Sequence, residues 1–150
     1  MYKVKKGLEY RKIVRISIFG DSEVGKSCII NRYINNEYPP DFLITIGIDK
    51  YEKKIELNNG NEIKVILWDT AGSERFRAPS LKTIRYTDGC IVVFDVTSKI
   101  SFENISIWID SIKDIHSDFV IILFGNKVDC DKSEWEVTNE EINKFIQEKN

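Results

Sequence analysis

The sequence contains few of the residues that define disulfide-rich, zinc-binding or membrane proteins. It has one histidine and three cysteines, Cys28, Cys90 and Cys130, among 150 residues. Because the cysteines are odd in number, widely spaced and without a CxxC pair, we expect neither a disulfide framework nor a zinc site. No apolar run approaches the roughly 20 residues of a membrane helix, and the basic stretch MYKVKKGLEYRK lacks the apolar core of a signal peptide. These absences predict a soluble protein of the reducing cytoplasm.

The chain also lacks an excess of either charge. Its 24 acidic and 22 basic residues leave a net charge of −2, which provides no overall field for binding nucleic acid or an anionic membrane. We expect neither as a partner. A chain of 150 residues that is 42% hydrophobic can bury one sizeable core, and we expect one globular domain without repeats or linkers.

Strand and helix patterns alternate along the chain. IVRISIF at 13–19 predicts a strand, and the apolar spacing within 27–34 predicts a helix. The turn signal NNG predicts a hairpin from about 47 to 68, whose first strand is polar enough for a sheet edge. The nearly continuous apolar runs at 90–96 and 119–125 are typical of parallel strands covered on both faces.

Two further helices complete the predicted fold. The first begins at a cap, Ser98 or Ser101, and carries an apolar stripe of Phe102, Ile105, Ile109 and Ile112, widened by Trp108 and Ile115. The second covers about 138–149 and begins at a Thr or Asn cap. The alternation predicts an α/β fold: a three-layer sandwich around a mostly parallel sheet with one antiparallel edge strand. Ligands then bind at the carboxyl ends of the strands.

The loop GDSEVGKS, residues 20–27, carries the first chemical motif. It fits G-x-x-x-x-G-K-[ST] and lies between a predicted strand and helix, as that pattern requires. The backbone N–H groups of such a loop bind phosphate oxygens, and Gly20 and Gly25 permit its tight path. We expect Lys26 to reach the terminal phosphates and the Ser27 hydroxyl to bind Mg²⁺. The alternative is a chance glycine-rich turn with a surface lysine.

Two other strand ends carry acids. Asp69 follows an apolar strand and can hold Mg²⁺, usually through water, opposite the Ser27 hydroxyl; the alternative is an Asp that caps the next turn. In GNKVD, residues 125–129, Asp129 can accept hydrogen bonds from a ring N–H and an exocyclic amine. Guanine presents that pair of donors and adenine does not. N-K-x-D alone also fits a polar turn, but its position at a third strand end favours a guanine site.

Together these motifs resemble the Ras superfamily of small GTPases, a branch of the P-loop NTPases, and the Rab proteins within it. The resemblance runs from about residue 12 to the end and also rests on TIGID (45–49), ERFR (74–77) and IVVFDVT (91–97). It implies GTP or GDP as ligand and Mg²⁺ held by Ser27, Thr45 and Asp69. The nucleotide contacts it implies are Gly20, Ser22, Glu23, Val24, Gly25, Lys26, Ser27, Cys28, Tyr38, Thr45, Gly72, Asn126, Lys127 and Asp129.

The resemblance also assigns roles to individual residues. Thr45 joins Ser27 on Mg²⁺ when a γ-phosphate is present, and Gly72 donates its N–H to that phosphate. Tyr38 lies beside the guanine, which Asn126 and Lys127 frame and Asp129 reads. The segments 36–50 and 72–85 then change order with the nucleotide and offer surfaces for an exchange factor and an effector.

Several positions depart from the family pattern. Ser73 replaces the Gln that orients the attacking water, so among the catalytic residues Gly72 and Ser73 we expect Ser73 to be ineffective and hydrolysis weak. Glu23 replaces a small residue and adds negative charge near the phosphates, although we expect its side chain to point to solvent. Lys50 and Thr83 replace aromatic residues that, with the Trp at position 68, shape the effector surface of Rab proteins.

The family fold also continues into a sixth strand and a final helix, which residues 1–150 do not contain. The sequence has no carboxyl-terminal cysteine pair or C-a-a-X box, so we expect a GTPase domain that is incomplete at its end, without a prenyl anchor in this chain. A longer polypeptide would add a further domain or a lipid anchor that brings it to membranes. One hypothesis is a slow GTPase switch in vesicle traffic, and the alternative is a non-hydrolysing GTP- or GDP-binding module of a larger protein. An adenine-specific P-loop ATPase or kinase would leave NKVD and TIGID without a role.

Overall fold

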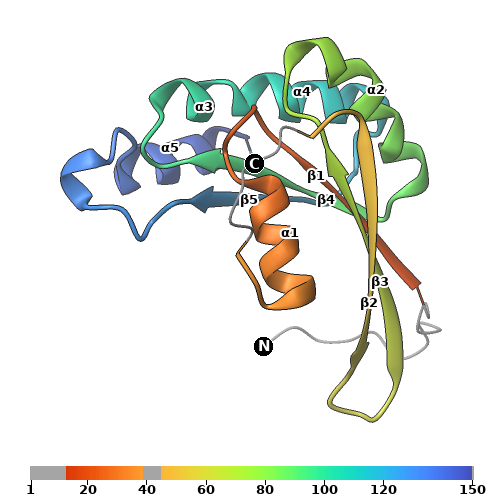
Figure 1. Cartoon of the computed structure of the whole chain (residues 1–150). Coiled ribbons are helices and arrows are strands. Elements are labelled where there is room, and N and C mark those ends of the chain that lie inside the picture. The colour runs from red at the N-terminus through yellow and green to blue at the C-terminus, as the bar shows by residue number, and fades with distance from the viewer. Residues whose placement is uncertain (1–12, 39–44, 150) are drawn as a thin grey trace.

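The computed structural model describes residues 13–38 and 45–149, which form a five-stranded sheet flanked by helices (Figure 1). The basic first residues and the middle of the 36–50 segment lie outside this description. The strand order is β2-β3-β1-β4-β5, and the strands are β1 (Ile13–Phe19), β2 (Ile48–Glu56), β3 (Glu62–Thr70), β4 (Gly89–Asp95) and β5 (Ile121–Asn126). All pairs are parallel except β2 with β3, which confirms a mostly parallel sheet with one antiparallel edge strand.

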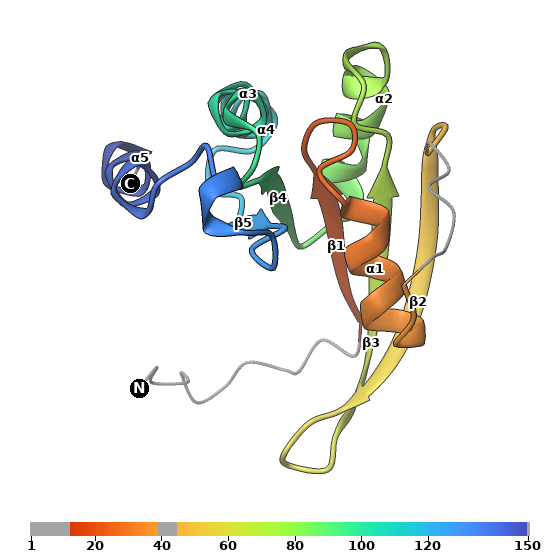
Figure 2. The same ribbon diagram turned by 60° about the vertical axis from the view of Figure 1, so that its left-hand side comes forward.

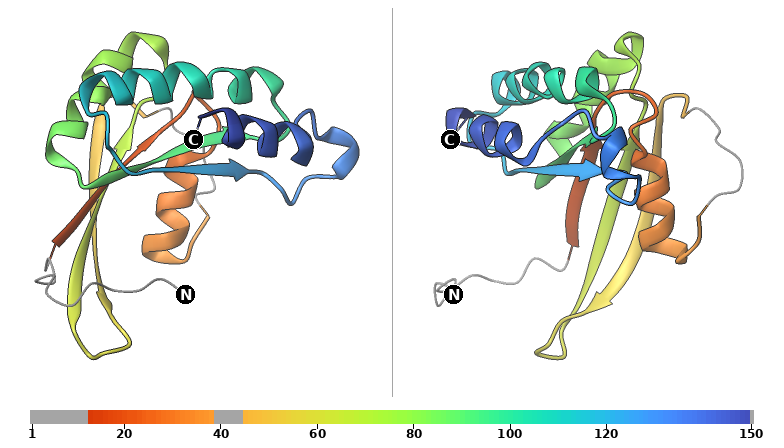
Figure 3. Two further views of the ribbon diagram at one scale, coloured as in Figure 1. Left: turned by 180° about the vertical axis from the view of Figure 1, so that it is seen from behind. Right: turned by 90° about the vertical axis from the view of Figure 1, so that its left-hand side faces the viewer.

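The helices lie on both faces of this sheet (Figure 2). They are α1 (Lys26–Asn35), α2 (Arg77–Leu81), α3 (Lys99–Glu103), α4 (Ile105–Ile115) and α5 (Asn139–Lys149). Helix α1 packs on one face against β1 and β3, while α3, α4 and α5 cover the other face. On that second face α3 and α5 are neighbours, with the rings of Phe102 and Phe145 centred 5.6 Å apart (Figure 3). None of the helices within the described ranges is long and apolar enough to cross a bilayer.

Strand β4 is covered on both faces, as its apolar run predicts. Val92 and Phe94 point into the cluster beneath α4 and α5, and Val93 points into the cluster beneath α1. The alternation follows from the two-residue period of a strand. This central strand therefore fixes the two helical layers relative to each other.

For β5 the same expectation is wrong, because only one of its faces is covered. Ile121 and Leu123 pack beneath α4 and α5. The alternate side chains Val120, Ile122 and Phe124 are 63%, 55% and 41% exposed. They lie on the face of α1, which packs over β1 and β3 and does not reach β5. An apolar strip is thus exposed at this edge of the sheet.

The single helix expected between β4 and β5 consists of two helices that meet at Asn104. Of the two candidate caps, Ser98 is the N-cap of α3, and its hydroxyl accepts a hydrogen bond from the N–H of Ser101. The apolar stripe is buried as expected except at Ile115, which is 42% exposed because α4 ends there. The Thr cap of α5 is confirmed: Thr138 Oγ1 accepts from the Glu141 N–H, and Glu141 Oε2 accepts from the Thr138 N–H.

Candidate functional site

The three motif-bearing loops meet at the carboxyl ends of β1, β3 and β5 (Figure 1). Asn126, at the end of β5, donates a 2.8 Å hydrogen bond from Nδ2 to the carbonyl of Val24. Gly72, after β3, lies so close to the loop after β1 that an added Cβ would be 2.3 Å from the Asp21 carbonyl oxygen. The parallel strand order therefore brings the motifs into one site, as a switch-point crevice requires.

The loop after β1 has a backbone path that needs its two glycines. Gly20 and Gly25 have φ angles of 138° and 95°. A Cβ would lie 2.2 Å from the Val93 carbonyl oxygen at Gly20, and 2.3 Å from Asn126 Nδ2 at Gly25. Gly25 is also the N-cap of α1, where no side chain caps the first N–H groups. Those N–H groups and the positive end of α1 suit a phosphate.

Lys26 lies inside this loop and is only 6% exposed. Its Nζ donates to the carbonyl oxygens of Gly20 and Asp21 at 3.0 and 2.6 Å. Burial lowers the pKa of Lys26 to about 8, although the charges of Asp69 and Asp21 oppose that shift. A phosphate in the loop would favour the charged ammonium and raise this pKa.

Ser27, Thr45 and Asp69 come together beside Lys26. The Ser27 hydroxyl donates to Asp69 Oδ2 at 2.5 Å and lies 2.9 Å from the Thr45 hydroxyl, which is itself 3.5 Å from Asp69 Oδ2. Asp69 is 1% exposed, and its buried Oδ1 has no hydrogen-bond partner in the described ranges. Burial raises the pKa of Asp69, against the hydrogen bond from Ser27 and the charge of Lys26.

This donor set fits a magnesium ion. Mg²⁺ prefers hydroxyl, carboxylate and water oxygens, and the orphaned Oδ1 of Asp69 is a buried acceptor that a cation or its water would satisfy. Clusters of three or more His, Cys, Asp or Glu that could hold a metal are absent from residues 13–38 and 45–149. The mixed site of two hydroxyls and one carboxylate is therefore the metal candidate of this part of the chain.

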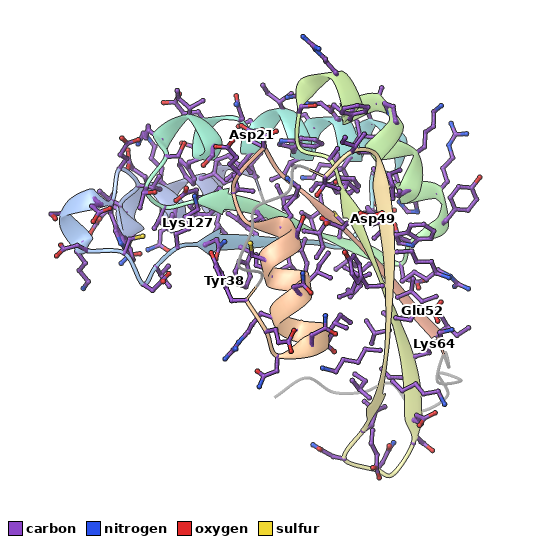
Figure 4. All side chains as sticks on the ribbon, in the orientation of Figure 1. Asp21, Tyr38, Asp49, Glu52, Lys64 and Lys127 are labelled. Atoms are coloured by element: carbon purple, nitrogen blue, oxygen red, sulfur yellow. The ribbon has the colours of Figure 1, made fainter. Side chains whose placement is uncertain are left out.

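The predicted base-binding residues lie at the end of β5. Lys127 has a left-handed backbone, with φ of 62°, and its Nζ forms a 2.5 Å ion pair with Asp95. Asp129 is exposed in the following turn. The Tyr38 side chain is 63% exposed. Partial desolvation, followed by the nearby Cys28 and Asp129, raises the pKa of its hydroxyl. Figure 4 shows Tyr38 and Lys127 on the same side of the molecule.

The remaining predicted residues lie around the same loop. Val24 is buried, while Ser22 and Glu23 are exposed. Gly72 has no room for a side chain, because a Cβ would be 2.4 Å from Lys26 Nζ. Ser73 is half-buried, and its hydroxyl makes no hydrogen bond to the rest of the described chain. The loop after β1 is thus in contact with both Gly72 and Asn126.

The sequence did not predict that the Asp21 carboxylate accepts two hydrogen bonds, one from helix α4 and one from the residue between α3 and α4. Asp21 Oδ2 accepts from Asn104 Nδ2 at 2.6 Å, and Oδ1 accepts from Trp108 Nε1 at 2.9 Å. The Arg77 guanidinium lies over the Trp108 ring, 4.9 Å from its centre. Asp21, Asn104 and Arg77 line a cavity of about 490 Å³, as do Glu23 and Lys127. The only sequence signal was an indole N–H on an otherwise apolar stripe, because such a group needs a partner when buried.

A second, apolar groove of about 350 Å³ lies beyond β3, lined by Ile48, Trp68, Pro79, Lys82, Thr83 and Tyr86. The Trp68 indole N–H is buried without a hydrogen-bond partner in the described part of the chain. Thr83 is buried against Ser17, with 2.7 Å between the hydroxyls. Lys50 does not line the groove and instead pairs with Glu52 at 2.7 Å.

Comparison with known proteins identifies a family and relatives of this chain. The model of the Ras family matches residues 15–150. The chain is 39% identical to a "Probable Rab-related GTPase" of Acanthamoeba polyphaga mimivirus, over 89% of this chain and 63% of the relative. It is 42% identical to "GTP-binding protein ypt2" of Schizosaccharomyces pombe, over 81% and 61%. For "Ras-related protein SEC4" of Saccharomyces cerevisiae the identity is 40%, over 83% and 58%. The chain thus spans about three fifths of the length of these relatives.

Proposed function

Because the chain belongs to the Ras family of small GTPases, we propose that it is a Rab-type molecular switch that binds GTP and GDP together with Mg²⁺. The loop of residues 20–27 binds the phosphates, with Lys26 facing them. Asn126, Lys127 and Asp129 hold and read the guanine, and Tyr38 and Cys28 line its other side.

The observation that carries this proposal is the convergence of Ser27, Thr45 and Asp69. These residues come from three separate segments, yet their side-chain oxygens lie within 3.5 Å of one another. Bound Mg²⁺ would supply positive charge that neutralises phosphate oxygens. Thr45 belongs to a segment without regular structure, so its bond to Ser27 is a contact that a nucleotide change can make or break. Gly72, which lies next to Lys26, senses the γ-phosphate through its backbone N–H.

The second part of this function, GTP hydrolysis, is slow. The Ser73 hydroxyl is too short to orient a water in line with the γ-phosphorus, so the chain hydrolyses GTP slowly. The alternative is a module that binds GTP or GDP and does not hydrolyse it. The specific observation that favours this second function is Ser73 itself.

The apolar groove is the proposed effector and exchange-factor surface. It is formed by residues of the 36–50 and 72–85 segments together with Tyr86 and Trp68. The Trp68 indole N–H, which has no acceptor among the described residues, can donate to a partner protein. Tyr86, one of the residues that line the groove, is 70% exposed. Because several curated relatives are named as Rab or Rab-related proteins, we place the switch in the cytoplasm and in vesicle traffic, at membranes if a lipid anchor is attached.

Two measurements test the proposal. Chromatography of the denatured, freshly purified protein should release GDP or GTP in near one-to-one ratio, and Lys26→Ala should lose it while keeping the circular dichroism of the parent. Adenine nucleotides, or none, would contradict the guanine assignment. Single-turnover hydrolysis then separates the slow GTPase from the non-hydrolysing module, since only the former releases phosphate above the rate of free GTP.

A further inference from the structure

Glu23 has a backbone conformation that its side chain disfavours. Its φ angle is 66°, and within the described ranges only Asn36 and Lys127 share such a positive φ among non-glycine residues. An L-residue with a long side chain pays free energy for this left-handed conformation, whereas Gly adopts it readily. Glu23 lies in the middle of the phosphate-binding loop, so that cost applies whenever the loop is held in this shape.

The Glu23 carboxylate is also without a countercharge. It is exposed and lines the cavity of about 490 Å³, but no hydrogen bond or ion pair joins it to another described residue. The bases along that cavity are Lys127 and Arg77. Lys127 is held by Asp95 at 2.5 Å, and Arg77 lies on the ring of Trp108. Neither therefore neutralises Glu23.

We propose that Glu23 shortens the lifetime of the bound nucleotide, so that the chain exchanges GDP for GTP without an exchange protein. This rests on the proposed function. The loop must keep the backbone of Glu23 in the left-handed conformation while phosphate is bound, and this backbone can relax when the site is empty. The carboxylate also repels the phosphates that Lys26 and the start of α1 attract. Both effects destabilise the bound state relative to the empty one.

Release of a fluorescent GDP analogue into excess unlabelled GTP, with Mg²⁺ present, measures this effect. Glu23→Gly removes both strain and charge and should slow release at least about tenfold. Glu23→Gln removes only the charge and should give an intermediate rate. Its difference from the parent should shrink as salt rises, because salt screens exposed charges. Glu56→Gln, an exposed acid on β2 far from the loop, is the control and should leave release unchanged.

The outcomes separate this inference from the proposed function. If the parent and Glu23→Gly both bind the analogue and release it at equal rates, Glu23 has no such role, although the guanine site stands. If neither protein binds guanine nucleotide although circular dichroism shows that both are folded, the proposed function fails and the inference fails with it. A slower Glu23→Gly with an unchanged Glu23→Gln would assign the effect to backbone strain alone.

Discussion

The Ser27 hydroxyl donates a 2.5 Å hydrogen bond to Oδ2 of Asp69, a residue 42 positions farther along the chain. Ser27 lies in the first turn of α1 and Asp69 lies near the end of β3, so the bond joins the loop of residues 20–27 to the sheet. Thr45 adds its hydroxyl from a third segment. A chain without a site at this position would have little reason to bury a carboxylate with one oxygen unpaired.

Removing Mg²⁺ should therefore release the nucleotide. With the parent protein we expect EDTA to accelerate GDP dissociation by about tenfold or more, because a divalent ion shared by hydroxyl, carboxylate and phosphate oxygens is lost. With Ser27→Ala, dissociation should already be fast and EDTA should add little. Stopped-flow release of a fluorescent GDP analogue measures both rates. Equal EDTA sensitivity of the parent and Ser27→Ala would mean that the metal lies elsewhere.

Base choice should depend on Asp129. We expect Asp129→Asn to weaken GDP binding severely and to shift preference toward xanthine nucleotides, because an amide complements the ring edge of xanthine. Competition titrations with GDP and XDP measure the shift. Asp131→Asn is the matched control: Asp131 lies two residues away and caps the short helix of Lys132–Glu134, so its substitution should leave base preference unchanged. Unaltered guanine preference in Asp129→Asn would contradict the assignment.

The exposed strip on β5 should make the chain prone to associate. Exposed apolar side chains next to an unpaired strand edge favour aggregation, and Ile122 is 55% exposed. We expect Ile122→Thr to raise the concentration at which the protein aggregates, with its melting temperature nearly unchanged. Leu123→Thr, whose side chain packs beneath α4 and α5, should instead destabilise the fold by about 2 kcal/mol. Equal effects of the two substitutions, measured by light scattering and thermal melts, would contradict this description of β5.

Much of the fold and site followed from local sequence patterns. The two-residue period of the strands, the glycine spacing of residues 20–27 and the acids after strands are local signals. The side-chain pairs Asp21 with Trp108 and Lys127 with Asp95 were not predictable, because they join segments that only the tertiary fold brings together. The exposure of one face of β5 depends on the tertiary fold in the same way: an apolar run shows which residues can be buried, and the placement of α1 decides whether they are.

Hydrolysis provides the last prediction, through Ser73. Gly72 has no space for a side chain beside Lys26, so the backbone there can approach a γ-phosphate whatever residue follows. The Ser73 side chain makes no hydrogen bond within residues 13–38 and 45–149, and it is free to be replaced. We therefore expect Ser73 to leave binding intact and not to place the attacking water, and such misplacement costs on the order of a hundredfold in rate.

We expect Ser73→Gln to raise single-turnover GTP hydrolysis several-fold, because its longer amide side chain reaches the attacking water. GDP affinity should stay within about twofold, because residue 73 affects only the placement of that water. Ser73→Ala is the matched control and should hydrolyse GTP at the parent rate, since a hydroxyl that positions nothing is lost without effect. A fall in rate with Ser73→Ala would show that the serine already acts in catalysis. If Ser73→Gln is no faster than the parent, the block lies in Glu23 or in the 72–85 segment, and the non-hydrolysing module becomes the better description. The slow hydrolysis expected from Ser73 and the rapid release proposed for Glu23 act in the same direction, because both keep the chain loaded with GTP where GTP exceeds GDP.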